Sequence, residues 1–199
     1  AELREKHEAV LIATGVYKAR EIKIPGVGRD GVVPALDFLT ASNRKSRGDD
    51  VAEFDSGALN AENKDVVVIG GGDTAMDCVR TAVRQNAKSV TCLYRRDKAN
   101  MPGSQREVQN AEEEGVNFQW LSAPHALLGD GSVRSVRARR IHLGQPDETG
   151  RQVPQIIENS DFDVDADLVI KALGFDPEDV PVMFGQPELG VSKWGTVKI

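Results

Sequence analysis

The stretch Asp65-Val-Val-Val-Ile-Gly-Gly-Gly-Asp-Thr-Ala75 decides the fold of this chain. Val66 to Ile69 are apolar and β-branched without alternation, which is typical of a strand buried on both faces of a parallel sheet. The apolar residues of 75–83 then recur at helical spacing, and the apolar run 90–94 indicates a second strand. The stretch therefore predicts a βαβ unit with a glycine turn at the first strand-to-helix junction.

The glycine turn predicts a binding site for the pyrophosphate of a dinucleotide. Gly70, Gly72 and Ala75 fit the first, third and sixth positions of the G-x-G-x-x-G/A pattern. Phosphates are expected at the helix N-terminus, where free N–H groups and the positive end of the helix dipole point at them. Asp73 has the alternative role of capping the helix. The predicted cradle consists of Gly70, Gly71, Gly72, Asp73, Thr74 and Ala75.

Two arginines follow the second strand, at the position that selects the nucleotide. An NAD site usually places Asp or Glu there to bind the ribose 2′-hydroxyl, whereas this chain has Arg95 and Arg96. Two guanidinium groups suit a 2′-phosphate because they offer charge and forked donors, so we predict NADP(H) rather than NAD(H). Two alternatives remain: a solvated arginine pair, or a shifted NAD site that uses Asp97.

The composition indicates an α/β protein with one substantial core, or one domain with fragments of another. The chain has 199 residues, of which 40% are hydrophobic, and a net charge of −6, which argues against a general nucleic-acid surface. It has no long apolar run and no secretory signal, so we expect a cytoplasmic protein with no membrane partner.

The cysteines and histidines do not form a reactive cluster in the sequence. Cys78 and Cys92 form neither a C-x-x-C pair nor a metal site, and are expected to be core thiols. His7, His125 and His142 are scattered. We therefore nominate no catalytic residue and no metal ligand.

Before the glycine turn, three segments have a readable pattern. Ala9–Gly15 is expected to be a short buried strand, Pro34–Arg44 a helix, and Asn43–Asn63 a polar surface connection. The chain starts inside a charged segment and stops at an unfinished strand pattern, Gly195–Ile199, so we expect a piece of a longer protein.

After Arg96 a second helix and a third parallel strand are expected. Ser104 and Glu107 have capping-box spacing for a helix that runs to Glu114, and Asn117–Leu121 is the strand candidate. Arg106 lies in the first turn of this helix, where it either reaches the cofactor phosphate or belongs to a solvated face.

The pattern then changes to an antiparallel meander. Strands are expected at Ala126–Leu128, Val133–Leu143 and Gln152–Ile157, with turns at Gly129–Gly131 and Gln145–Gly150. The second strand alternates apolar residues with four arginines, which are expected to be a solvated face unless an acidic partner lies nearby.

The end of the chain returns to a buried strand at Asp167–Gly174, whose form matches that of Ala9–Gly15. The matching pair suggests a domain inserted into a host domain. We expect the end of the host domain and a connecting segment at 1–60, a nucleotide-binding domain at 61–174, and a return into the host domain at 175–199.

Six short motifs carry a family resemblance. They are Ala-Thr-Gly at 13–15, Val-Ile-Gly-Gly-Gly-Asp-Thr-Ala-Met-Asp at 68–77, Tyr-Arg-Arg-Asp at 94–97, Met-Pro-Gly-Ser at 101–104, Asn-Ala-Glu-Glu-Glu-Gly-Val at 110–116, and Asp-Leu-Val-Ile-Lys-Ala-Leu-Gly-Phe at 167–175. With them the sequence resembles the small (β) subunit family of bacterial NADPH-dependent glutamate synthase. The run from 94 to 104 is the most specific.

The resemblance implies a glutathione-reductase-like fold, in which a Rossmann-like parallel sheet with an antiparallel β-meander binds NADPH and is inserted in an FAD domain. It implies that NADPH reduces FAD, and that electrons pass through iron–sulfur clusters to the large subunit for glutamate synthesis. It places Gly70–Ala75 at the pyrophosphate, Arg95 and Arg96 at the 2′-phosphate, and Ala172, Leu173 and Gly174 near the nicotinamide.

The FAD fingerprint and the cluster cysteines are expected outside this chain, because two separated cysteines cannot supply a four-thiolate cluster. We therefore expect the isolated chain to bind NADPH without turnover. The alternatives are the NADPH part of a dihydropyrimidine dehydrogenase or ferredoxin–NADP reductase, and a non-catalytic module with a relic nucleotide site. A methyltransferase is disfavoured by the arginine pair.

Overall fold

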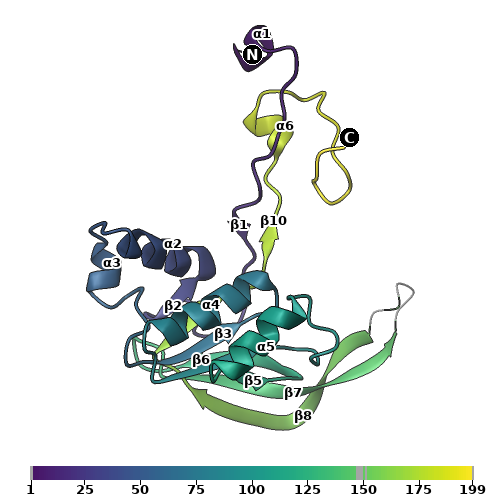
Figure 1. The fold of residues 1–199 in the computed structure, drawn as a ribbon. Helices are drawn as coiled ribbons and strands as arrows, with labels where there is room; N and C mark the ends of the chain where they lie inside the picture. Colours follow the sequence, from purple (N-terminus) through teal and green to yellow (C-terminus); the bar gives the residue numbers. More distant parts are fainter. Residues whose placement is uncertain (1, 147–149, 151, 199) are drawn as a thin grey trace. The chain divides into compact units, whose positions relative to one another are not determined.

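The computed structural model describes residues 2–146, 150 and 152–198, and the contacts divide them into two compact units. The larger unit is Glu21–Gly174, and the smaller unit is made of the residues before and after it. Figure 1 labels the helices and strands of both units.

The centre of the larger unit is a parallel sheet of five strands in the order β2-β9-β3-β4-β5. The strands are β2 (Val32–Pro34), β3 (Asp65–Ile69), β4 (Ser89–Leu93), β5 (Asn117–Gln119) and β9 (Leu168–Lys171). β9, which comes last in the sequence among the strands of this sheet, therefore lies between β2 and β3. The predicted parallel strands, including the third one at 117–121, are confirmed.

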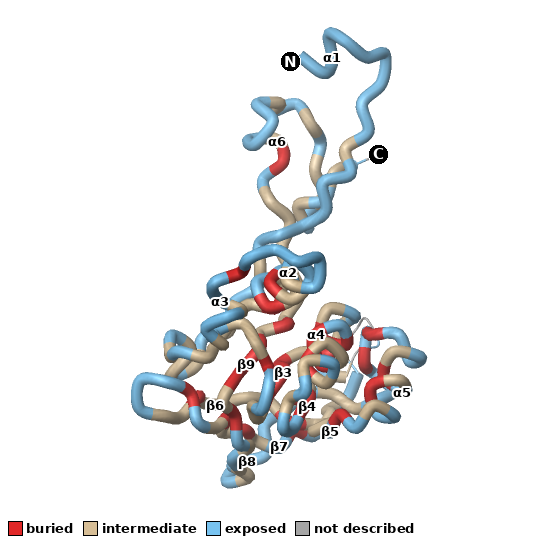
Figure 2. The backbone as a smooth tube through the Cα atoms, turned by 60° about the vertical axis from the view of Figure 1, so that its left-hand side comes forward, coloured by how far each residue is buried: buried red, intermediate tan, exposed pale blue. Residues whose placement is uncertain are grey.

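Both faces of this sheet are buried, which explains why the strands lack alternation. Val66 and Val68 pack in a core with the helices, whereas Val67 and Ile69 pack in a second core with the meander. Figure 2 shows the resulting run of buried residues along β3, β4 and β9. The helices are α2 (Ala35–Ser46), α3 (Ala52–Asp55), α4 (Asp73–Arg84) and α5 (Gln105–Glu113).

The meander is an antiparallel sheet of β6 (Ser122–Leu128), β7 (Ser135–Pro146) and β8 (Gln152–Asp165). The predicted meander is confirmed, although β8 is longer than expected and residues 147–149 of the second predicted turn lie outside the described residues. Two of the arginines of β7 have acidic partners. The Nε atom of Arg137 lies 2.9 Å from Oδ1 of Asp163, and the Nε atom of Arg139 lies 3.1 Å from Oδ1 of Asp161. Both aspartates belong to β8. The expectation of a merely solvated face is therefore wrong for these two arginines.

The smaller unit contains α1 (Glu2–Lys6), α6 (Val180–Met183) and an antiparallel pair, β1 (Lys18–Ala19) with β10 (Phe175–Asp176). The prediction of a buried strand at Ala9–Gly15 is wrong. An apolar segment needs a paired neighbour to become a buried strand, and in the described part of the chain these residues have none, so Leu11 is 89% exposed.

The connecting segment predicted before residue 60 makes its contacts within the larger unit, where β2 pairs with β9 and α2 packs against α4. The predicted boundary at residue 60 stays a prediction. The helix expected at Pro34–Arg44 is confirmed as α2, which begins directly after Pro34. The assignment of the residues before and after the larger unit to an FAD domain stays a prediction.

Both cysteines are buried and free, which confirms that they are core thiols. Burial raises the pKa of the Cys92 thiol to about 12, and that of the Cys78 thiol rises further for the same reason. None of the described helices combines the length and apolar character that a membrane crossing requires.

An ion-pair cluster joins α4 to α5. Arg80 lies 2.8 Å from Glu114 and also pairs with Glu107, and Arg84 lies 3.1 Å from Glu114. The predicted capping box is wrong, because the Ser104 side chain makes no cap hydrogen bond and Glu107 faces Arg80 instead. The hydrogen bond from Arg80 is the main cause that lowers the pKa of the Glu114 carboxyl from its ordinary value of 4.5.

This lowered pKa predicts a pH-dependent contribution to stability. The stabilisation is present above the unfolded-state pKa of Glu114 and is lost as the pH falls through the folded-state value. Glu114→Gln should lower the free energy of unfolding by about 1 kcal/mol at pH 7, and by much less near pH 3. Urea unfolding at both pH values measures this, with the exposed Glu62→Gln as control. An effect that is equal at both pH values would contradict it.

Candidate nucleotide-binding site

Gly70 lies where the carboxyl ends of β3 and β9 meet. Its φ of +143° lies in the region that favours glycine, and a Cβ atom at Gly70 would overlap the carbonyl oxygen of Ala172. The Ala172 amide donates a hydrogen bond to the Ile69 carbonyl at 2.9 Å. The structure therefore brings together two segments that the sequence analysis placed at the site.

Gly71 and Gly72 differ in how much space is free beside their backbone. A Cβ atom at Gly71 would lie 2.5 Å from the ring of Tyr94, whereas one at Gly72 would have no atom within 4 Å. The Gly70 amide also donates to the Leu93 carbonyl at 3.2 Å. The turn is thus closed on the Tyr94 side and open at Gly72, where a phosphate group would approach the backbone.

Helix α4 begins at this opening. In the described part of the structure, the amides of Gly72, Asp73 and Thr74 donate to no backbone acceptor, so their N–H groups are available to an anion. Ala75 is fully buried, and its amide donates to the Gly72 carbonyl at 2.9 Å. The small residue at this position lets the helix pack directly against the sheet.

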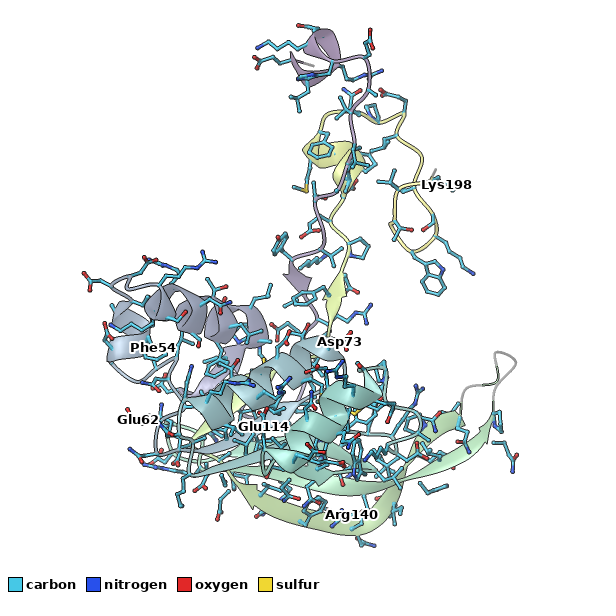
Figure 3. The ribbon with its side chains drawn as sticks, viewed as in Figure 1. Phe54, Glu62, Asp73, Glu114, Arg140 and Lys198 are labelled. Carbon is cyan, nitrogen blue, oxygen red and sulfur yellow. The ribbon has the colours of Figure 1, made fainter. Side chains whose placement is uncertain are left out.

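Asp73 does not cap its helix, so that expectation is wrong. The residue before the helix is Gly72, and no side chain caps the helix N-terminus. The Asp73 carboxylate instead accepts a hydrogen bond from the Ser104 amide at 2.9 Å. Figure 3 labels Asp73 at the start of α4. No local sequence pattern signals this bond, because Asp73 and Ser104 belong to the entrances of different helices.

Arg95 and Arg96 follow β4 at the same edge of the sheet. β4 pairs with β3 so that Leu93 is opposite Ile69, and Tyr94 then contacts Gly71. Within the described ranges neither arginine has an ion pair or a side-chain hydrogen bond. The Nε atom of Arg96 is buried without a partner. A buried guanidinium donor without an acceptor is unfavourable, so a phosphate oxygen at this place would fit.

One carboxylate oxygen of Asp97 accepts hydrogen bonds within its own turn. Its Oδ1 atom accepts from the backbone amide of Asn100 at 2.9 Å and from the side-chain amide of the same residue at 2.8 Å. An acid that holds a ribose hydroxyl needs a free oxygen directed toward the ligand. The other carboxylate oxygen, Oδ2, makes no hydrogen bond in the described part of the chain, so the turn does not exclude the shifted NAD site.

A loop that the sequence analysis did not assign to the site lies against the glycine turn. The Gly103 amide donates to the Gly71 carbonyl at 3.0 Å, and the Tyr94 hydroxyl donates to the Asn100 carbonyl at 3.1 Å. The family motif at 101–104 was the signal that could have found it. Arg106 is exposed in the first turn of α5 and has no ion-pair partner among the described residues.

The remaining predicted residues follow β9. Leu173 is half-buried and packs against the core on the meander side, and Gly174 has a φ of +85° where the larger unit ends. Their position at the carboxyl edge is shared with the glycine turn. A role near the nicotinamide stays a prediction.

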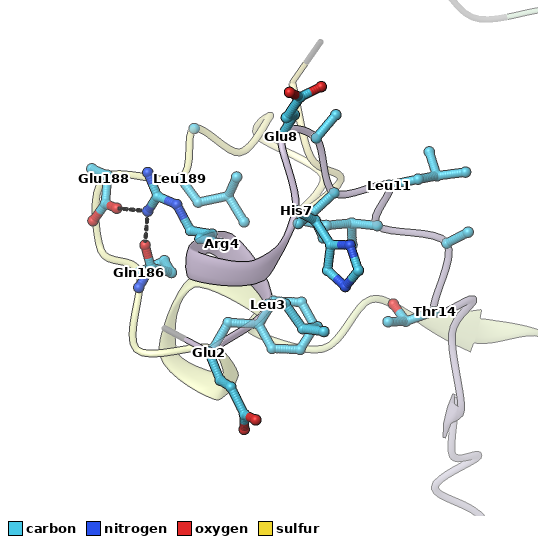
Figure 4. A pocket seen from close by; sticks show the side chains of 16 residues that line it. Glu2, Leu3, Arg4, His7, Glu8, Leu11, Thr14, Gln186, Glu188 and Leu189 are labelled. Atoms are coloured by element: carbon cyan, nitrogen blue, oxygen red, sulfur yellow. Dashed lines mark hydrogen bonds and ion pairs between the residues drawn. The ribbon is translucent and has the colours of Figure 1, made fainter.

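A cavity in the described part of the chain lies elsewhere. It has a volume of about 960 Å³, belongs to the smaller unit and is lined by residues of 2–14 and 184–190. Figure 4 shows Arg4 at this cavity, 3.3 Å from Glu188. None of the predicted nucleotide-site residues lines it. The candidate nucleotide site therefore rests on backbone geometry and charge.

A parallel sheet with a glycine turn at its carboxyl edge defines a dinucleotide-binding α/β protein. Within that class, the chain belongs to the pyridine nucleotide-disulphide oxidoreductase family, whose model matches residues 2–199.

Two curated relatives cover nearly the whole chain. It is 65% identical over 198 residues to the glutamate synthase [NADPH] small chain of Azospirillum brasilense, covering 100% of this chain and 41% of that protein. It is 62% identical over 196 residues to the putative glutamate synthase [NADPH] small chain of Cereibacter sphaeroides, covering 98% and 47%. The predicted resemblance is confirmed, and the chain spans less than half the length of these relatives.

Solved structures confirm the fold class. FprA from Mycobacterium tuberculosis in complex with NADPH has a TM-score of 0.70 at 18% identity, covering 90% of this chain and 53% of that chain. Thioredoxin reductase from T. acidophilum has a TM-score of 0.62 at 16% identity, covering 92% and 49%. At these identities the similarity concerns the fold alone.

The space around Gly70 and Gly72 predicts different losses of folding stability when each is replaced by alanine. Gly70→Ala should lower the free energy of unfolding by more than about 2 kcal/mol, because its Cβ meets a backbone oxygen at a positive φ. Gly72→Ala should cost less than about 1 kcal/mol, since its φ is −92° and its Cβ meets nothing. Urea unfolding of both variants checks this, and equal costs would contradict the geometry.

Proposed function

We propose that this chain is the NADPH-binding part of a glutamate synthase small subunit. The observation that carries the proposal is the unpaired, buried Nε of Arg96, next to Arg95 at the edge that holds the glycine turn. The high identity to two glutamate synthase small chains supports the choice within the family. The residues fit NADPH because an open turn and unpaired guanidinium groups share one edge of the sheet.

In this proposal each segment has a separate task. The backbone amides of Gly72, Asp73 and Thr74 bind the pyrophosphate, which the absence of side chains at 70–72 permits. Arg95 and Arg96 bind the 2′-phosphate through charge-assisted hydrogen bonds. Ala172, Leu173 and Gly174 lie beside the nicotinamide, where the small side chain of Ala172 and the absence of one at Gly174 leave room for a flavin.

FAD, when bound, supplies the hydride acceptor, and this chain orients the donor. We place FAD and the iron–sulfur clusters in the longer protein, from which electrons pass to the large subunit for glutamate synthesis. Cys78 and Cys92 do not fit a cluster, because both thiols are buried and have raised pKa values that disfavour the ligating thiolates. The relatives' names and the family support this assignment.

Removal of the arginine pair tests the proposal directly. Arg95→Ala with Arg96→Ala should weaken NADPH binding by roughly 100-fold, because each guanidinium donates charge-assisted hydrogen bonds to the phosphate. NADH lacks that phosphate, so its affinity should change by less than about threefold. Isothermal titration of the chain with both nucleotides measures this.

The matched control is Arg137→Ala with Arg139→Ala, which removes the same charge from the meander. This control should leave both affinities unchanged within about twofold, since exposed charges at a distance are screened. An equal loss of NADPH and NADH in the Arg95 and Arg96 variant would refute phosphate recognition. A wild-type chain that binds neither nucleotide would favour the relic-site alternative.

Gly72→Ala addresses the pyrophosphate separately. The added Cβ would occupy the open space at the turn, so NADPH and NADH should both bind about tenfold more weakly while the fold is retained. The measurement is the same titration, together with the urea midpoint. A loss confined to NADPH would show that Gly72 does not face the pyrophosphate.

A further inference from the structure

Asp73 places a negative charge at the entrance of α4, where the pyrophosphate is proposed to bind. A carboxylate at this place repels a phosphate, so its presence needs a reason. The helix does not supply that reason, because Asp73 makes no cap hydrogen bond. Its carboxylate oxygen Oδ1 accepts the Ser104 amide hydrogen at 2.9 Å.

A second hydrogen bond lies directly beside the first. The Gly103 amide donates to the Gly71 carbonyl at 3.0 Å, and a Cβ atom at Gly103 would come within 3.2 Å of that same oxygen. Two successive amides, those of Gly103 and Ser104, are thus fixed to the glycine turn. We call these two bonds the latch.

The latch fixes the start of α5. Ser104 is the residue before the helix, Arg106 is the second helical residue, and the Ser104 side chain forms no cap of its own. Since a helix propagates from its first turn, a fixed Ser104 also fixes the backbone of Arg106. The Arg106 side chain is exposed and, across the described ranges, has no ion pair or hydrogen bond. It is therefore available to a ligand at this edge.

We propose that Asp73 is a positioning residue for NADPH binding, because it holds the first turn of α5 against the glycine turn and so brings Arg106 to a phosphate group of the nucleotide. This inference rests on the proposed function and names a determinant of that same site. The hydrogen-bonding ability of Asp73 is the useful property, and its charge is tolerated because the Ser104 amide and the α4 N-terminus both offset it.

Two variants separate the hydrogen bond from the charge. Asp73→Ala removes both, whereas Asp73→Asn keeps an oxygen that accepts from the Ser104 amide and removes the charge. Titration with NADPH should show binding roughly three- to tenfold weaker for Asp73→Ala, and unchanged or tighter for Asp73→Asn. Asp77→Ala is the matched control: an exposed carboxylate on the same helix that makes no hydrogen bond in the described part of the chain.

Two further measurements report on the latch itself. Amide hydrogen exchange at Ser104 without nucleotide should accelerate at least tenfold in Asp73→Ala and stay near the wild-type rate in Asp73→Asn. In a double-mutant cycle, Asp73→Ala should cost little once Arg106→Ala is present, because the latch acts through Arg106. A loss confined to NADPH assigns Arg106 to the 2′-phosphate, and a loss shared with NADH assigns it to the pyrophosphate.

Equal weakening by Asp73→Ala and Asp73→Asn would overturn the inference, as would additive effects in the cycle or unchanged exchange at Ser104. These failures differ from failure of the proposed function. If the wild-type chain binds no NADPH, the proposed function fails, whereas Ser104 exchange still tests the hydrogen bond.

Discussion

The structure depends on the contact of three strand ends around a residue that can carry no side chain. The Gly70 amide donates to the Leu93 carbonyl, and the Ala172 amide donates to the Ile69 carbonyl, so β3 is tied to β4 on one side and to β9 on the other. Any Cβ at Gly70 would overlap the Ala172 carbonyl. Because the strands are parallel, their following segments emerge at this one edge, where ligands bind in folds of this type.

Among the residues that the structure describes, some arginines of the larger unit form ion pairs with carboxylates, and others do not. Arg80, Arg137 and Arg139 each pair with a carboxylate on a neighbouring element, and partly exposed pairs of this kind contribute about 0–1 kcal/mol each. Arg95 and Arg96 have no such partner in the described part of the chain, although the Nε of Arg96 is buried. The net charge of −6 makes this local excess of positive charge more distinctive as a site for an anion.

Features that depend on local sequence could be predicted, and those that depend on tertiary register could not. The apolar run of β3, the helical spacing of α4 and the glycine turn are local, and all three were predicted correctly. The bond between Asp73 and Ser104 joins the entrances of two helices, so each residue alone suggested a cap. Glu107 likewise fitted a capping box, but the partly buried Arg80 on α4 is a stronger partner.

The unpaired donor of Arg96 also suggests how the proposed site would distinguish two nucleotides that differ by one phosphate. A buried donor without an acceptor costs about 1–3 kcal/mol, and a ligand that supplies the acceptor recovers this free energy on binding. A nucleotide with a 2′-hydroxyl offers a single uncharged acceptor oxygen there, which recovers less of this cost than a phosphate oxygen does. Discrimination in the proposed site therefore combines attraction to the phosphate with relief of an unfavourable feature of the free protein, which is how sites built around polar groups reject analogues that lack the matching group.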